Sequence, residues 1–373
     1  MVKSPASHPR PQALLKLACV VGARPNFIKM AALIAEFRRR PSFDVRLIHT
    51  GQHFSPEMSQ AFFDDLELPA PDLNLEVSGG TGTFQTAEVM KRIEPVFLAQ
   101  RPDLLVVVGD VNSTLAAALV AAKLGIPIAH VESGLRSFDR TMPEEINRVL
   151  TDAISDYLFV TEPDGVANLL SEGVPSQKIH LVGNVMIDTL LRFREKAARS
   201  RILEHLGLHA KQYAVATLHR PSNVDSLERL NALVGVFAQL AKRLPVVFPV
   251  HPRTRGRMET AGLSAPNLLL TAPLSYLEFL KLMSEARLVL TDSGGIQEET
   301  TILGVPCLTV RENTERPGTI ERGTNRLVGT DPQRILEAAI EVLGANEMHA
   351  TAPELWDGLA GARIANVLEQ GAC

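Results

Sequence analysis

A glycine-rich turn near residue 293 carries residue types that could bind a nucleotide. Residues 291–299 read TDSGGIQEE and follow the apolar run 286–290, which predicts a buried parallel strand. Ser293 suits the N-cap of a helix whose first N–H groups and positive dipole end would attract a phosphate. Glu298 and Glu299 follow about one turn later, where a carboxylate could accept hydrogen bonds from ribose hydroxyls. A strand–turn–helix corner with a solvated glutamate pair fits the same residues equally well.

Other charged and polar residues follow further apolar runs in both halves of the chain. Ligands of open parallel sheets bind beyond the carboxyl ends of the strands, so these residues would face one cleft. Any one of them could instead be a helix cap or a surface charge, but their shared position at strand ends favours a functional site. They are Arg24, Lys29, Asp110, Glu132, His219, His251 and Ser293.

Apolar runs that alternate with helical segments must position these side chains. Each run is almost wholly apolar, as are strands that helices cover on both faces. The pattern predicts an α/β fold of two Rossmann-like domains with parallel sheets facing a central cleft. We expect domains at residues 1–182 and 183–354, with a C-terminal helix within 355–373 that packs back on the first. The expected strands are 17–21, 45–50, 104–108, 126–131 and 157–160, then 213–217, 246–250, 268–270, 288–290 and 305–309.

Composition excludes several classes of protein. The 373 residues are 45% hydrophobic and 21% charged, as in globular rather than disordered chains. A net charge of −4 and the lack of a basic stripe give no reason to expect a nucleic acid. No apolar run reaches the roughly 18 residues of a membrane span. Cys19, Cys307 and Cys373 lie far apart without metal spacing, which predicts a reduced, cytoplasmic protein.

Short motifs along nearly the whole chain resemble one family. The combination is similar to the non-hydrolysing UDP-N-acetylglucosamine 2-epimerases, whose fold is that of the two-domain GT-B glycosyltransferases. The motifs occur in the order of that family and are much more specific together than singly. They are GARP at 22–25 with Lys29, GQH at 51–53, GD at 109–110, HVESGLR at 130–136, PEEINR at 143–148, GN at 183–184, HR at 219–220, DSGGIQEE at 292–299 and TERP at 314–317.

The resemblance implies an epimerisation at C2 that needs no nicotinamide cofactor. UDP leaves C1, the resulting oxocarbenium character acidifies the C2 proton, and its removal gives a glycal to which UDP adds back. The resemblance assigns proton transfer and cation stabilisation to Asp110, Glu132 and Glu144, and leaves open which carboxylate acts on which face of the sugar. His219 would join the catalytic set by stabilising the departing phosphate.

The resemblance also implies where the substrate binds. It places the ribose on Glu299, the phosphates on residues 293–295 and the uracil near Leu274 and Phe279, although Phe279 fits a helix core as well. It implies no cofactor and no metal, a UDP-sugar as the partner molecule, and a homodimer. The expected binding residues are Arg24, Lys29, Arg136, His251, Leu274, Phe279, Ser293, Gly294, Gly295, Glu299 and Arg316.

Other activities fit the same motifs. One is a hydrolysing epimerase that releases the free sugar, and another is an epimerase for a UDP-diacetamido-uronic acid. From a different class come a GT-B glycosyltransferase and a catalytically silent nucleotide-sugar binder. A transferase does not need three carboxylates at one sugar carbon, which favours an epimerase.

A second substrate molecule activates some bacterial members of this family. Gln52, His53 and His251 match contacts of that regulatory site. Pro221 stands where those members have an arginine, and residues 80–85 lack another. Because arginine holds a diphosphate through paired hydrogen bonds, we expect the second site to be weak or absent unless Arg136, Arg140 or Arg220 replaces them.

Overall fold

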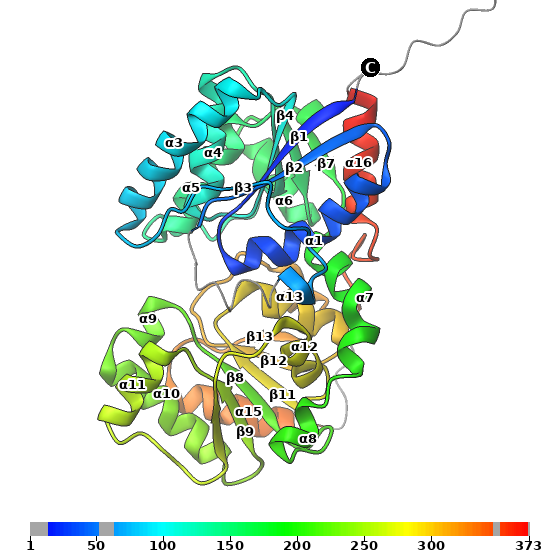
Figure 1. Ribbon diagram of the computed structural model, residues 1–373. Coiled ribbons are helices and arrows are strands. Elements are labelled where there is room, and N and C mark those ends of the chain that lie inside the picture. Colours follow the sequence, from blue (N-terminus) through cyan, green and yellow to red (C-terminus); the bar gives the residue numbers. More distant parts are fainter. Residues whose placement is uncertain (1–13, 52–62, 346–350, 372–373) are drawn as a thin grey trace, which may run out of the picture.

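The computed structural model describes residues 14–51, 63–345 and 351–371. The chain forms two α/β domains, drawn one above the other in Figure 1. Each has one sheet in which every strand pair is parallel, with the order β3-β2-β1-β4-β5-β6-β7 in domain 1 and β10-β9-β8-β11-β12-β13 in domain 2. The predicted fold class is confirmed.

The strands of domain 1 are short and apolar. The five residues of β4 read LLVVV and are all buried, because helices cover both faces of the sheet. The strands are β1 (Leu15–Val21), β2 (Phe43–His49), β3 (Leu73–Asn74), β4 (Leu104–Val108), β5 (Ile128–Ser133), β6 (Tyr157–Val160) and β7 (Ile179–Leu181). The helices are α1 (Arg24–Arg39), α3 (Gly82–Ala99), α4 (Asn112–Lys123), α5 (Pro143–Ile154), α6 (Pro163–Ser171) and the short 3₁₀ helix η1 (Ser176–Lys178).

Domain 2 repeats the alternation of strands and helices. Its strands are β8 (Ala214–Thr217), β9 (Val246–Pro249), β10 (Leu268–Thr271), β11 (Leu288–Thr291), β12 (Cys307–Thr309) and β13 (Asn325–Leu327). Its helices are α8 (Ile202–Leu206), α9 (Pro221–Val224), α10 (Leu227–Leu240), α11 (Pro252–Thr260), α12 (Tyr276–Ser284), α13 (Gly294–Leu303), α14 (Gly318–Glu321) and α15 (Pro332–Gly344).

Two helices tie the domains together. Helix α7 (Val185–Ala198) packs against α1 of domain 1 and against α12 and α13 of domain 2. Helix α16 (Ala360–Gly371) follows domain 2 in sequence but lies on α1 and α7, beside domain 1 (Figure 1). Asp188 of α7 accepts hydrogen bonds from the N–H groups of Ala360 and Gly361 at 3.2 and 2.7 Å, which fixes the start of α16. Across the described ranges, no helix has the length and apolar character needed to cross a membrane.

Candidate functional site

Glu132 lies at the centre of the domain junction. It is the penultimate residue of β5 and has a φ of 68°, in the left-handed region, where the pairing of β5 with β6 shifts register between Val131 and Ser133. This bend brings the carboxylate into ion pairs with two cations. The Glu132 residue is only 4% exposed to solvent. Lys29 of α1 contacts one oxygen, and Arg316 of domain 2 donates to the other at 2.6 Å. Glu132 thereby joins the two domains.

Asp110 follows the neighbouring strand β4. Arg148 of α5 donates to its Oδ2 from Nη2 at 2.7 Å and from Nε at 3.0 Å. Burial raises the pKa of Asp110, but Arg148, Lys29 and Arg316 outweigh burial and the pKa is lowered overall. A side chain on Gly109 would come within 3.2 Å of Lys29 Nζ and 3.4 Å of Glu132 Oε2, so the Asp110 turn lies against the Glu132 ion pair.

Arg316 is surrounded by three carboxylates. Besides Glu132, it donates from Nε to Glu298 at 2.6 Å and from Nη1 to Glu315 at 2.5 Å. These carboxylates raise the pKa of Arg316 well above its usual value despite its burial. A Cβ on Gly294 would lie 2.4 Å from Arg316 Nη1, so the first glycine of the turn makes room for this guanidinium. The role of Arg316 as a UDP contact stays a prediction.

His219 follows β8 and forms a pair with Asp292 across the sheet of domain 2. Its Nδ1 lies 2.6 Å from Asp292 Oδ1. Burial lowers the pKa of His219, but Asp292 outweighs it and the net pKa is raised. Burial likewise opposes ionisation of Asp292, yet His219, Asn223 and the N–H of Arg220 lower its pKa to about 2. The His219 side chain remains 62% exposed to solvent, so it can still meet a ligand.

Glu144 is the third predicted carboxylate and behaves differently from the other two. It lies in the first turn of α5 and is exposed, whereas Asp110 and Glu132 are held by buried cations. Glu144 contributes to the raised pKa of His219, which places its charge near that ring across the domain junction. The structure therefore brings Glu144 to His219 and Asp110 to Glu132.

The predicted phosphate site is the start of α13. Ser293 occupies the N-cap position, as expected, but its side chain makes no capping hydrogen bond. The N–H groups of Gly294, Gly295 and Ile296 have no acceptor within the part of the chain that the structure describes. They can donate to an anion, and the helix dipole favours one there.

Glu299 is buried behind this turn, and among the described residues Tyr276 is its hydrogen-bond partner. The hydroxyl of Tyr276 donates to its Oε1 at 2.9 Å. Burial raises the pKa of Glu299 to about 7, an effect that the Tyr276 hydrogen bond reduces and the nearby Glu298 increases. Leu274 and Phe279 are partly buried and pack against the same hydrophobic core, and Arg24 Nη2 donates to the carbonyl of Leu274 at 3.4 Å.

Replacing Glu299 with alanine should weaken UDP binding by about tenfold to a hundredfold. The loss corresponds to charge-assisted hydrogen bonds of about 1.5–3 kcal/mol to the ribose. Isothermal titration with UDP measures it, and Glu337→Ala, at an exposed glutamate of α15, is the matched control. Wild-type affinity in Glu299→Ala would place the nucleotide elsewhere.

The remaining predicted binding residues lie apart from this group. Arg136 is buried within domain 1, where it pairs with Asp152 at 2.8 Å and Glu172 at 2.7 Å, so its guanidinium is committed to these carboxylates. Asp152 also holds His130, whose Nε2 lies 2.9 Å from the carbonyl of Gly109 and so supports the Asp110 turn. His251 follows β9 and is exposed, and Gln52 and His53 fall outside the described residues.

Several residues of the site were not selected from the sequence. Arg148 belongs to the PEEINR motif and Glu315 to the TERP motif, so a signal for both was present. Tyr276 carried no signal beyond a helix start, where Ser275 forms a capping box with Glu278. Glu162 follows β6 as the other site residues follow their strands, and the same reasoning could have found it.

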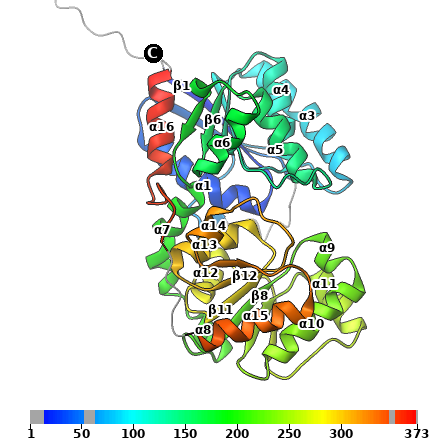
Figure 2. The ribbon, with the colours of Figure 1, turned by 180° about the vertical axis from the view of Figure 1, so that it is seen from behind.

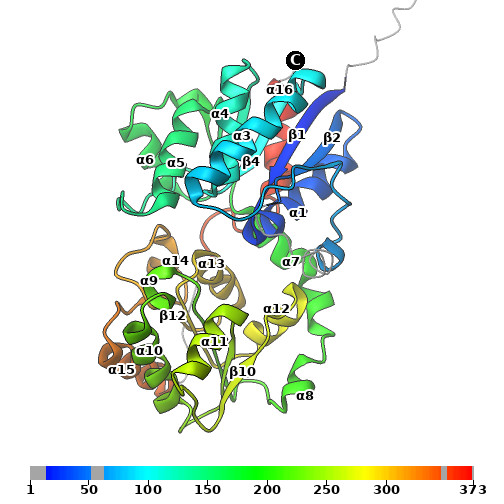
Figure 3. The ribbon, with the colours of Figure 1, turned by 60° about the vertical axis from the view of Figure 1, so that its left-hand side comes forward.

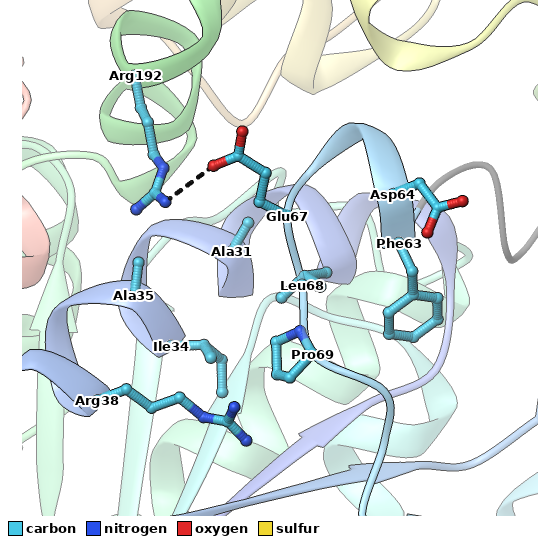
Figure 4. Close-up of a pocket in the computed structure, with 10 residues that line it drawn as sticks. All are labelled: Ala31, Ile34, Ala35, Arg38, Phe63, Asp64, Glu67, Leu68, Pro69 and Arg192. Carbon is cyan, nitrogen blue, oxygen red and sulfur yellow. Dashed lines mark hydrogen bonds and ion pairs between the residues drawn. The ribbon is translucent and has the colours of Figure 1, made fainter.

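A separate pocket of about 570 Å³ lies between α1, residues 63–69 and Arg192 of α7 (Figure 4). Arg192 Nη2 pairs with Glu67 Oε2 at 3.3 Å at its rim. None of the predicted site residues lines it.

Comparisons with known proteins agree with this geometry. The family model for UDP-N-acetylglucosamine 2-epimerase matches residues 35–369. A UDP-N-acetylglucosamine 2-epimerase homologue of Methanococcus maripaludis is 46% identical over 90% of this chain and 94% of its own. A UDP-2,3-diacetamido-2,3-dideoxy-D-glucuronate 2-epimerase of Pseudomonas aeruginosa is 42% identical over 88% of this chain and 93% of its own.

The fold agrees as well. The crystal structure of the Methanocaldococcus jannaschii UDP-GlcNAc 2-epimerase, in complex with UDP-GlcNAc and UDP, superposes with a TM-score of 0.89 at 42% identity, covering 95% of this chain and all of that one. The family match spans both domains from the end of α1 onward. The chain belongs to the UDP-N-acetylglucosamine 2-epimerase family.

Proposed function

We propose that this protein interconverts UDP-N-acetylglucosamine and UDP-N-acetylmannosamine without hydrolysis. The observation that carries the proposal is the position of Asp110 and Glu132 at the carboxyl ends of the adjacent strands β4 and β5, with the charge of Glu144 near His219 at the same junction. C2 inversion by elimination and re-addition requires groups that exchange protons at the sugar and groups that hold departing UDP. This junction supplies both kinds.

The two carboxylates at the ends of β4 and β5 suit proton transfer at C2. The lowered pKa of Asp110 keeps it ionised at neutral pH, so it is fitted to accept a proton. Glu132 is held rigidly between Lys29 and Arg316, which fixes its direction relative to the sugar. Glu144 is open to the solvent.

Domain 2 provides the groups that would hold UDP. The free N–H groups at the start of α13 and the His219 ring, whose raised pKa favours the cation, can stabilise the charge of the departing diphosphate. Glu299 can accept ribose hydroxyls, and its pKa of about 7 means that its acceptor form gains population as pH rises through neutrality. Neither role calls for a metal or a cofactor.

NMR of the purified protein with UDP-N-acetylglucosamine in D₂O tests the proposal. Removal and return of the C2 proton predicts deuterium at C2 and a UDP-linked manno product. Free N-acetylmannosamine would instead show a hydrolysing enzyme, and an unchanged spectrum would favour a transferase or a silent binder.

A second substrate is favoured by one specific observation. The Pseudomonas relative named for a diacetamido-glucuronate is nearly as similar to this chain as the Methanococcus relative. The same D₂O experiment with the diacetamido-uronate sugar decides between them, because the true substrate should incorporate deuterium at the greater rate. A homodimer remains the expectation from the resemblance.

A further inference from the structure

Glu162 is a buried carboxyl group that the proposed mechanism does not use. It follows β6 and forms the N-cap position of α6 with an extended backbone, and its side chain makes no capping hydrogen bond. The residue is 2% exposed. Within the described ranges, neither of its carboxyl oxygens has a hydrogen-bond partner.

This carboxyl group faces the other domain. A Cβ on Gly318, the first residue of α14, would lie 2.6 Å from Glu162 Oε2, so the carboxyl group rests against the backbone of domain 2. Gly318 closely follows Arg316, which reaches from the same turn to Glu132. Figure 2 shows α6 and α14 on opposite sides of the domain junction, and Figure 3 shows the same juxtaposition from another direction.

The charges around Glu162 oppose its ionisation. From domain 2 the charges that act on it are Glu298 of α13, Arg316 just before α14, and Glu321 of α14. From its own helix the charge is Asp164. The one cation among them, Arg316, already donates to three other carboxylates. A buried carboxylate without its own donor is strongly disfavoured, so the group is held as the neutral acid. Burial is the largest cause and the charge of Glu298 the next, and together they raise the pKa of Glu162 to about 8.

We propose that Glu162 is a positioning residue. It takes up a proton when the two domains close, and as the neutral acid it holds the segment that carries Arg316 where Arg316 can donate to Glu132. When the domains separate, Gly318 leaves the carboxyl group and water can reach it. Its pKa then returns toward the ordinary glutamate value of about 4.3. The proton that Glu162 binds on closing therefore comes from solvent and returns to it on opening.

The sign of the pH effect follows from these two pKa values. The closed form has the higher pKa, so a proton stabilises closure fully below about pH 4.3. Between that pH and about 8, each unit of rising pH shifts the balance about tenfold toward the open form. At pH 7, closing should take up about 0.9 proton per chain.

Glu162→Gln separates this role from simple packing. The amide has the shape of the neutral acid but cannot ionise, so it keeps the contact with Gly318 and removes the proton uptake. The matched control is Glu337→Gln, which makes the same change at an exposed glutamate of α15 that is not among the charges acting on Glu162.

The test measures protons in two ways and rests on the proposed function only in the first. Titration with UDP at pH 7, in buffers of different ionisation enthalpy, should show about 0.9 more proton taken up by wild type than by Glu162→Gln, if the free protein is open. If the free protein is already closed, the proton is already bound before UDP is added. The thermal unfolding midpoint then gives the test: between pH 5.5 and 8.5, the midpoint of wild type should fall relative to that of Glu162→Gln. Glu337→Gln should behave as wild type in both measurements.

A difference in either measurement supports the role of Glu162, and equal behaviour of wild type and Glu162→Gln in both overturns it. Failure of UDP to bind any variant would count against the proposed function, while the melting curves would still decide the role of Glu162.

Discussion

Glu132→Gln should lower turnover of the nucleotide sugar by roughly 10² to 10⁴-fold, because the amide keeps the shape of the side chain but cannot carry a proton. The same change at the neighbouring strand end, Asp110→Asn, should have an effect of similar size. Both variants should bind UDP nearly as well as wild type, since the groups proposed to hold the nucleotide come from domain 2.

Steady-state rates and UDP titrations on the same preparations make this comparison. Glu337→Gln, on the exposed face of α15, is the control for the chemical change itself. If Glu132→Gln lost UDP affinity in proportion to turnover, Glu132 would be a binding group and the proton would be moved by another residue.

Arg316→Gln should lower the free energy of unfolding by about 3–5 kcal/mol, because it leaves Glu132, Glu298 and Glu315 without their shared guanidinium. Burial raises the pKa of Glu315, but Arg316, followed by Arg311 and Arg148, outweighs burial and holds that pKa well below its usual value. This contribution is present above the ordinary glutamate pKa and is lost as pH falls through the folded value. The deficit of Arg316→Gln should therefore shrink below about pH 4.3.

Urea unfolding curves at pH 7 and at pH 4 measure the deficit. Arg316→Lys is the informative partner variant, since it keeps one charge but not the planar set of donors that reaches three carboxylates. A midpoint equal to wild type in Arg316→Gln would show that the ion pairs across the junction contribute nothing to stability.

The fold could be predicted because its determinants are local. The run LLVVV at residues 104–108 has the composition of a strand covered on both faces, and the structure places β4 at the same residues. Parallel sheets bring strand ends together, so Asp110 and Glu132 could be expected as neighbours from their positions alone.

The pairing of charges could not be predicted in the same way. Arg316 and Glu132 are 184 positions apart, and their ion pair depends on how the domains meet. Arg136 follows a strand end as the other site residues do, yet it points inward, because Asp152 of α5 and Glu172 after α6 provide buried and half-buried partners. Sequence position shows which edge of the sheet a residue occupies, but the nearest opposite charge decides where a long side chain goes.

The position of α16 has a consequence for synthesis on the ribosome. Ile364, Ala365 and Leu368 of this helix belong to the same hydrophobic core as Phe37 of α1, and Arg40 of domain 1 pairs with Glu369 at 2.6 Å. Helix α7 covers α1 before domain 2 is made, but the residues of α16 that also pack on α1 emerge only after all of domain 2 has been translated. Domain 2 can complete its own core during translation, whereas the first domain to emerge is the last to be completed. A nascent chain stalled before residue 360 would expose the apolar part of α1 that α16 covers, the kind of surface that chaperones bind.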